Sequence, residues 1–144
     1  MNQYFDTSVL VAYYSPEALS AKAEKLLRKA SPPVISRLAE VEFAAAVSRK
    51  IRDNQLAHSA GHKILNLFQP HVTQGFYRVL TVEGHHFEQA REWIARFDTP
   101  LRTLDALHLV LTALENARLI TADRQLHESA TLLGVESLLL AARR

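Results

Sequence analysis

Four acidic residues stand where a parallel α/β fold would gather them. They are Asp6, Glu42, Asp105 and Asp123. Several carboxylates packed together cannot all stay ionised unless a cation balances their charge, and hard divalent ions such as Mg²⁺ and Mn²⁺ prefer oxygen ligands. An ion of this kind activates water and stabilises an in-line displacement at phosphorus. The four acids therefore indicate metal-dependent phosphoryl chemistry.

The elements that must position these acids alternate between strands and helices along the 144 residues. Apolar runs and alternation predict strands at residues 2–6, 34–36, 76–80, 117–121 and 135–138. Helical spacing and capping residues predict helices at about 8–14, 16–30, 37–52, 55–69, 84–97, 104–114 and 123–133. This order is typical of a parallel sheet with helices on both faces.

The expected helix starts depend on particular capping residues. Thr7 or Ser8 is expected to cap the first helix, and Thr103 the helix that carries Asp105. For the second helix, Ser15 is expected as the N-cap, with Pro16 at the first helical position. Gly134 is expected to end the helix that Asp123 opens. The carboxyl ends of parallel strands meet at one edge of a sheet, where ligands bind, so we expect the four acids to lie close together.

Three of the four acids also have an ordinary structural explanation. Asp123 suits a helix N-cap, Asp105 is favoured by the helix dipole, and Glu42 can be a solvated helix residue. Asp6 is different, because an acid that ends a buried strand normally has a specific partner. The helical wheel does not choose between Glu42 and its neighbour Glu40.

Composition sets further bounds on the function. The chain has no Cys, which excludes disulfides, thiolate zinc sites and cysteine nucleophiles and fits a reducing compartment; we expect a cytoplasmic protein. No apolar segment approaches the ~18 residues of a membrane span. The net charge is only +2. If the four acids share one pocket, the surface outside it is more basic than this value, which suits a polyanionic substrate.

Two other phosphoryl chemistries fail on residue spacing. A haloacid-dehalogenase-like phosphatase needs a second Asp two positions after Asp6, where this chain has Ser8. No G-x-x-x-x-G-K-[S/T] phosphate loop is present. Arg102 and Arg124 flank two of the acids and are candidates for phosphate contact. His108, one turn after Asp105, is expected to be an ordinary half-buried histidine, with a place at the rim of the site as the alternative.

Four motifs, in this order, resemble those of a known family. They are Phe5-Asp6-Thr7-Ser8-Val9-Leu10, Ser36-Arg37-Leu38 with Glu42 four positions beyond the leucine, Leu101-Arg102-Thr103-Leu104-Asp105-Ala106-Leu107-His108-Leu109, and Leu119-Ile120-Thr121-Ala122-Asp123-Arg124. The chain resembles the PIN-domain ribonucleases, and among them the VapC-type toxins of prokaryotic toxin–antitoxin pairs. The resemblance implies a PIN-like three-layer α/β/α sandwich with a central parallel sheet of four to five strands, formed as a single domain over residues 1–144.

The resemblance also implies an activity and a set of roles. The activity is Mg²⁺- or Mn²⁺-dependent endonucleolytic cleavage of RNA, and the four acids receive metal or catalytic roles. The family glutamate matches Glu42 rather than Glu40, because it follows the Ser-x-Leu unit at that spacing. Ser8 and Thr121 are similar to hydroxyls that support the acids.

The partners implied by the resemblance are an RNA substrate, a cognate antitoxin protein and a second copy in a homodimer. The helices predicted over about 37–69 form a hairpin that is a candidate partner-binding clip. An alternative function stays open: a catalytically inactive PIN-like module that binds RNA or protein.

Overall fold

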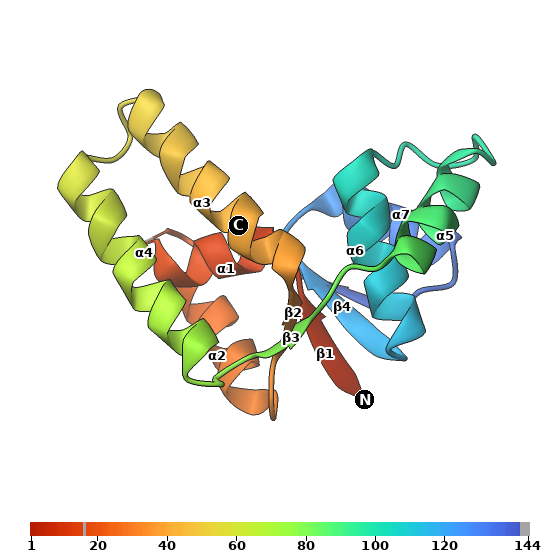
Figure 1. The fold of residues 1–144 in the computed structure, drawn as a ribbon, viewed down its shortest axis with the longest axis horizontal. Coiled ribbons are helices and arrows are strands. Elements are labelled where there is room, and N and C mark those ends of the chain that lie inside the picture. The colour runs from red at the N-terminus through yellow and green to blue at the C-terminus, as the bar shows by residue number, and fades with distance from the viewer. Residues whose placement is uncertain (16, 142–144) are drawn as a thin grey trace.

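The computed structural model describes residues 1–15 and 17–141, and these residues form one all-parallel sheet of five strands in the order β3-β2-β1-β4-β5 (Figure 1). The strands are β1 (Asn2–Phe5), β2 (Val34–Ser36), β3 (Arg78–Leu80), β4 (Ala117–Thr121) and β5 (Ser137–Leu139). The helices are α1 (Thr7–Tyr14), α2 (Ser20–Lys29), α3 (Arg37–Arg52), α4 (His58–Thr73), α5 (Gly84–Ile94), α6 (Thr103–Leu114) and α7 (Arg124–Leu132).

Both faces of the sheet are covered by helices. Successive strand residues point to opposite faces, so Phe5 joins an apolar core with α1 to α4, whereas Tyr4 joins a second core with α5 to α7. The predicted α/β/α sandwich is therefore confirmed. Among the described residues, no helix is both long enough and apolar enough to cross a bilayer.

The order in which strands are added to the sheet reverses at β1. β2 and β3 lie on one side of β1, and β4 and β5 lie on the other. Ligands of open α/β sheets bind at such a switch point, outside the carboxyl ends of the strands. β1 and β4 pair with Phe5 opposite Ile120, and the Asp6 N–H donates to the Ile120 carbonyl at 3.1 Å. Asp6, which directly follows β1, and Thr121, the last residue of β4, consequently lie next to each other at the carboxyl edge of the sheet.

The start of α2 differs from the expectation. Ser15 was expected to cap this helix, but it ends α1 instead, with its N–H donating to the Val11 carbonyl at 2.9 Å. The α2 helix begins at Ser20, whose hydroxyl donates to the Ala12 carbonyl at 2.6 Å and ties the two helices together. Pro16, the expected first helical residue, lies outside the described residues.

The caps of two other helices also differ from the expectation. Asp6, rather than Thr7 or Ser8, caps α1, and its side chain accepts from the Val9 N–H. Thr103 is the first residue of α6 instead of its cap. The cap at Asp123 and the end of α7 before Gly134, which has a φ of 72°, agree with the prediction.

Helices α3 and α4 lie side by side as a hairpin (Figure 1). The α3 bounds match the prediction, but α4 begins at His58 rather than 55, because the chain first turns through Asn54 with a φ of 57°. Gly61 of α4 allows the close packing: a Cβ there would lie 2.7 Å from Cδ1 of Ile51. This hairpin holds Glu42 at the carboxyl edge of the sheet.

Candidate active site

The four acids lie at or near the amino-terminal ends of four helices, and these helix ends are at the carboxyl edge of the sheet. Asp6 caps α1, Asp123 caps α7, Asp105 is in the first turn of α6, and Glu42 is in the second turn of α3. Three of them line one cavity of about 700 Å³, which we call the acidic cavity. Its lining residues are Glu42, Arg49, Arg102, Thr103, Leu104, Asp105, Asp123 and Gln125.

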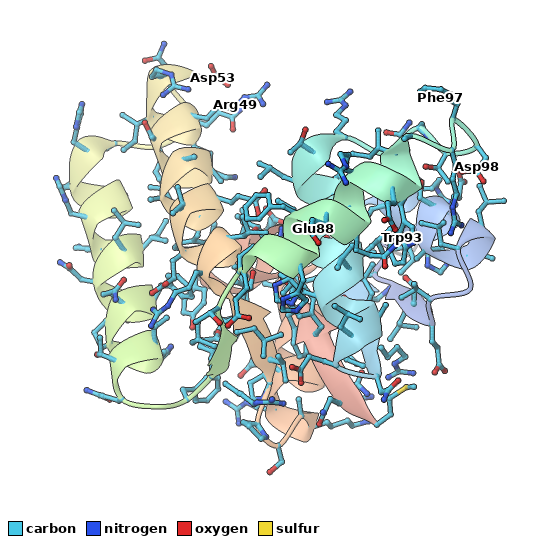
Figure 2. The ribbon with its side chains drawn as sticks, turned by 45° about the vertical axis from the view of Figure 1, so that its right-hand side comes forward. Arg49, Asp53, Glu88, Trp93, Phe97 and Asp98 are labelled. Atoms are coloured by element: carbon cyan, nitrogen blue, oxygen red, sulfur yellow. The ribbon has the colours of Figure 1, made fainter. Side chains whose placement is uncertain are left out.

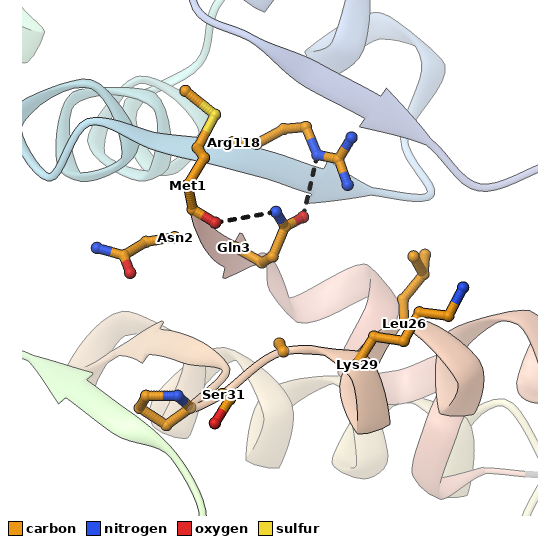
Figure 3. A pocket seen from close by; sticks show the side chains of 9 residues that line it. Met1, Asn2, Gln3, Leu26, Lys29, Ser31 and Arg118 are labelled. Atoms are coloured by element: carbon orange, nitrogen blue, oxygen red, sulfur yellow. Dashed lines mark hydrogen bonds between the residues drawn. The ribbon is translucent and has the colours of Figure 1, made fainter.

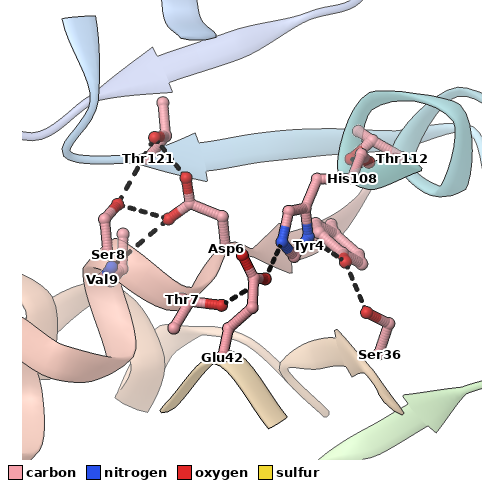
Figure 4. Close-up of polar contacts among 10 residues, drawn as sticks. All are labelled: Tyr4, Asp6, Thr7, Ser8, Val9, Ser36, Glu42, His108, Thr112 and Thr121. Atoms are coloured by element: carbon pink, nitrogen blue, oxygen red, sulfur yellow. Dashed lines mark hydrogen bonds and ion pairs between the residues drawn. The ribbon is translucent and has the colours of Figure 1, made fainter. Parts of the chain in front are cut away.

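Asp6 does not line the acidic cavity, because it is only 4% exposed. Three donors hold its carboxylate (Figure 4): the Ser8 hydroxyl at 2.5 Å, the Thr121 hydroxyl at 2.5 Å and the Val9 N–H at 3.3 Å. Burial raises the pKa of Asp6 above its usual value, although the charge of His108 and the Ser8 and Thr121 hydrogen bonds act in the opposite direction. The ionised carboxylate is thus well oriented but poorly balanced by charge.

The donors of Asp6 also fix the turn that carries Asp123. The Thr121 hydroxyl accepts from the Asp123 N–H at 3.0 Å, and the Ser8 hydroxyl accepts from the Ala122 N–H at 2.9 Å. Residues from α1 and β4 therefore form one network. The two hydroxyls predicted to support the acids lie where they orient Asp6 and place Asp123.

Glu42 is held by residues from two other elements. Its Oε1 accepts from the Thr7 hydroxyl at 2.9 Å and lies 2.5 Å from Nε2 of His108 (Figure 4). His108 is 3% exposed, so the expectation of an ordinary half-buried histidine is wrong. The sequence signal was its spacing, because the third residue after Asp105 lies on the same face of α6.

Two charged groups at the cavity have shifted pKa values of opposite sign. Burial acts to raise the pKa of Glu42, but the hydrogen bond and charge of His108, together with the Thr7 hydrogen bond, outweigh it and lower the pKa. The pKa of Asp105 is raised, first by burial and then by the nearby charge of Asp123. A cation near Asp105 would relieve this repulsion.

The structure separates the two glutamates that the helical wheel left equivalent. Glu40 forms an ion pair with Arg37 at 2.8 Å on the first turn of α3. Glu42 lines the acidic cavity and also an adjoining cavity of about 720 Å³ between α1 and α3. Glu42 is therefore the glutamate that faces both cavities.

Carboxylate oxygens that accept from no protein donor are candidate ligands for a metal ion. Both donors to Glu42 converge on Oε1, and the Gln125 and Leu126 N–H groups both donate to Oδ1 of Asp123. Among the described residues, no protein group donates to the second oxygen of either acid or to Asp105. Such oxygens are the ligands that a hard divalent ion prefers.

The donor chemistry fits Mg²⁺ or Mn²⁺, but the carboxylates are not drawn tightly together. Within residues 1–15 and 17–141, no group of three His, Asp or Glu side chains is placed to hold one metal ion. Mg²⁺ usually keeps several of its waters and takes only one or two protein carboxylates directly. Water-mediated contacts would therefore complete such a site.

Arginines border the acids. Arg102 and Arg49 line the acidic cavity, and Arg52 lines the adjoining one. Arg124, the other predicted phosphate contact, is the exposed first residue of α7 and is not among the lining residues. Figure 2 shows Arg49 and Asp53 near the end of α3, where their side chains are 3.7 Å apart.

Another cavity, of about 180 Å³, lies at the opposite, amino-terminal edge of the sheet (Figure 3). There the Arg118 Nε–H donates to the Gln3 side-chain oxygen at 3.0 Å, and the Gln3 amide donates to the Met1 carbonyl at 3.3 Å. No acid lines this cavity. The chemistry that the acids indicate therefore belongs to the carboxyl edge.

Solved structures of VapC toxins share this fold. VapC20 of Mycobacterium tuberculosis, described as a sarcin–ricin loop cleaving toxin, is 20% identical with a TM-score of 0.71, over 89% of this chain and 95% of that chain. VapBC2 of Rickettsia felis, bound to a fragment of its promoter DNA, is 15% identical with a TM-score of 0.69, over 98% and 100%. DNA-bound VapBC of Salmonella typhimurium is 15% identical with a TM-score of 0.66, over 98% and 99%.

No curated relative matches the sequence of this chain. Identities of 15% to 20% to the solved structures show the shared fold alone. The family model for the PIN domain, in contrast, matches residues 4–132 and so spans all four acids. With this match and the parallel sheet that carries the acids, the chain belongs to the PIN-domain family.

Proposed function

We propose that this protein is a metal-dependent endoribonuclease and the toxin component of a toxin–antitoxin pair. The observation that carries the proposal is the acidic cavity: three acids and two arginines line it at the switch point of a PIN fold. Glu42, Asp105 and Asp123 would hold Mg²⁺ or Mn²⁺, directly or through water. The buried Asp6, at the end of β1, would add its negative charge to the site. The bound ion would activate water and balance charge at the scissile phosphate.

The chain's own residues orient the acids and bind the substrate in this proposal. Ser8 and Thr121 fix the Asp6 carboxylate with their hydroxyls. Arg102 would bind phosphate at the cavity wall, because a guanidinium donates to two phosphate oxygens at once. Arg124 would contact phosphate further along the RNA. RNA as substrate is supported by the sarcin–ricin loop cleaving toxin that shares the fold.

Neutralising a single acid tests the proposed activity. Asp6→Asn and Asp105→Asn should each lower Mg²⁺-dependent RNA cleavage by about 100-fold or more, because several kcal/mol of transition-state stabilisation depend on the bound ion. The matched control is Asp98→Asn, which removes an exposed acid in the loop after α5 (Figure 2). RNA cleavage is followed by mapping new 5′ ends. Undiminished cleavage by Asp6→Asn or by Asp105→Asn would overturn the assignment.

The same fold could also be a catalytically inactive module that binds RNA or protein. The absence of a ready-made group of three ligands among the described residues favours this second candidate. Calorimetric titration with Mn²⁺ separates the two. The nuclease should bind Mn²⁺ at a site that Asp6→Asn and Asp105→Asn weaken, whereas the inactive module should show no site that depends on these acids.

We propose a cognate antitoxin as the protein partner, with the α3–α4 hairpin as the clip that binds it. Two neighbours in fold are VapBC assemblies bound to DNA. An apolar cavity of about 410 Å³ lies between the two helices, lined in part by Val47, Ile51 and Leu65. Co-expression with the neighbouring open reading frame should relieve growth arrest by this chain.

Three further parts of the proposal concern the oligomeric state, the extent of the domain and the location in the cell. A homodimer is supported by exposed apolar side chains around α5, where Phe97 is 90% exposed and Phe87 is 52% exposed. Residues 1–144 forming one PIN domain and a cytoplasmic location both remain predictions. Sedimentation velocity of the purified chain tests the dimer.

A further inference from the structure

A buried chain of polar side chains connects the middle of the sheet to Glu42. The Tyr4 hydroxyl on β1 donates to the Ser36 hydroxyl on β2 at 2.8 Å and lies 2.6 Å from Nδ1 of His108 on α6. Nε2 of the same ring lies 2.5 Å from Oε1 of Glu42 on α3 (Figure 4). Tyr4, Ser36 and His108 are all buried, so water does not compete for these contacts.

Both nitrogens of the His108 ring are engaged, which fixes the ring in the plane that these contacts define. An ionised carboxylate only accepts hydrogen bonds, so the Nε2–H of His108 donates to Glu42. The backbone of His108 is tied as well, since its carbonyl accepts from the Thr112 hydroxyl at 2.8 Å. Because the ring of His108 is held at Nδ1, it can hold the Glu42 carboxylate in place at Nε2.

Glu42 needs such a constraint. Its side chain is partly exposed, and it is the one acid among the described residues that lines both cavities. Its other donor, the Thr7 hydroxyl, also meets Oε1, so the two contacts leave Oε2 without a donor among the described residues. Rotation of the carboxylate would lose both hydrogen bonds together.

We infer that His108 is a positioning residue: with Tyr4 behind it, it holds Oε1 of Glu42 so that Oε2 stays available to a divalent ion. The inference rests on the proposed function, and it adds His108 and Tyr4 to the groups on which metal binding depends. His108 itself touches neither metal nor substrate in this arrangement. Its effect is to keep the Glu42 carboxylate oriented before the ion arrives.

Two amide substitutions separate the two ring nitrogens. His108→Gln places an amide nitrogen near the position of Nε2, so the donor to Glu42 is retained. His108→Asn places its shorter amide near Nδ1, so the contact with Tyr4 is retained and the donor to Glu42 is lost. Both variants remove the same ring from the same buried position and thus control for each other.

The measurement is calorimetric titration of the metal-free protein with Mn²⁺, alongside thermal unfolding of each variant. We expect His108→Asn to weaken Mn²⁺ binding by about 10- to 100-fold, which is typical for loss of a group that orients a ligand. His108→Gln should bind Mn²⁺ more tightly than His108→Asn whatever its thermal stability, because it keeps the donor to Glu42, but more weakly than the wild type, because it gives up the contact with Tyr4. A structural role alone would make the affinity follow the unfolding temperature in both variants.

Equal Mn²⁺ affinity in the two variants would overturn the inference, whether both lose binding or both retain it. Failure of the wild type to bind Mn²⁺ would instead overturn the proposed function, and the inference with it. Should His108→Asn not fold, Tyr4→Phe takes its place, because it keeps the buried ring and removes only the hydroxyl beside Nδ1. Weaker Mn²⁺ binding by Tyr4→Phe supports the inference, and unchanged binding overturns it.

Discussion

Residues of one chemical type have different properties at this site because their surroundings differ. Asp6 and Glu42 are both held by hydroxyl donors, but Asp6 is buried more deeply, and its pKa is raised whereas that of Glu42 is lowered. The first cause of the difference is the deeper burial of Asp6, and the second is His108, which hydrogen-bonds to Glu42 but acts on Asp6 through its charge alone. Without a cation, Asp6 therefore carries a charge that the fold does not fully balance.

Asp6→Asn should consequently stabilise the metal-free protein. Because the pKa of Asp6 is raised in the folded state, wild-type stability falls as pH rises from the unfolded value through the folded one. Asn removes this loss and still caps α1. We expect Tm at pH 8 to rise by about 2–4 °C, on the order of 1 kcal/mol, with a smaller gain at pH 5.

Thermal unfolding in EDTA at several pH values measures this effect, with Asp98→Asn as the exposed control. The control variant should keep the wild-type Tm across the pH range. A lower Tm for Asp6→Asn at pH 8 would contradict the account of Asp6 as a buried, poorly balanced charge.

At the scale of elements, an aromatic cluster holds the α3–α4 hairpin against α1. The ring centroid of Phe68 on α4 lies 4.4 Å from that of Phe43 on α3 and 5.3 Å from that of Tyr14 on α1. Glu42 directly precedes Phe43, so this packing also sets where Glu42 meets His108.

Truncation of Phe68 should therefore destabilise the fold. Phe68 is 2% exposed, and Phe68→Ala should cost about 3–5 kcal/mol in the free energy of unfolding, through lost burial and the cavity left behind. The adjacent Leu67 is 55% exposed, and Leu67→Ala should change stability by less than about 0.5 kcal/mol. Urea denaturation of the two variants provides the comparison, and equal costs would count against the cluster as the anchor of the hairpin.

At the scale of the whole molecule, the helices that carry the acids pack on opposite faces of the sheet. α1 and α3 cover one face and α6 and α7 the other, so the acids meet only at the edge where both layers end. A cation bound at this edge would connect the two layers. Metal binding should for this reason be visible as stability of the entire fold.

Mn²⁺ should raise Tm, and the gain should grow with pH. The pKa values of Asp6 and Asp105 are both raised, so at low pH protons compete with the ion for these carboxylates. At 100 times the dissociation constant the stabilisation is about 2.7 kcal/mol, or about 5–10 °C for a chain of this size. Differential scanning calorimetry at pH 5 and pH 8 tests this, and a gain that is independent of pH would contradict it.

Much of this fold follows from local patterns. The bounds of α3 and β4 and the cap at Asp123 agree with the sequence prediction, because helical spacing, apolar runs and N-caps depend on neighbouring residues. The predicted start of α2 was wrong, because Ser15 ends α1 instead of capping α2. Both roles suit a serine locally, and the Ser20 contact with Ala12 is tertiary.

The sequence by itself determined which acids follow strands, and thereby the edge of the sheet where chemistry would take place. The family motif already favoured Glu42 over Glu40, but only the tertiary structure showed that Glu42 lines both cavities, that Asp6 is almost fully buried, and that His108 joins Tyr4 to Glu42. The physical reason is that these contacts join residues far apart in the sequence. His108 and Glu42 are 66 positions apart, and their contact exists only because α3 and α6, from the two helical layers, both begin at one edge of the sheet.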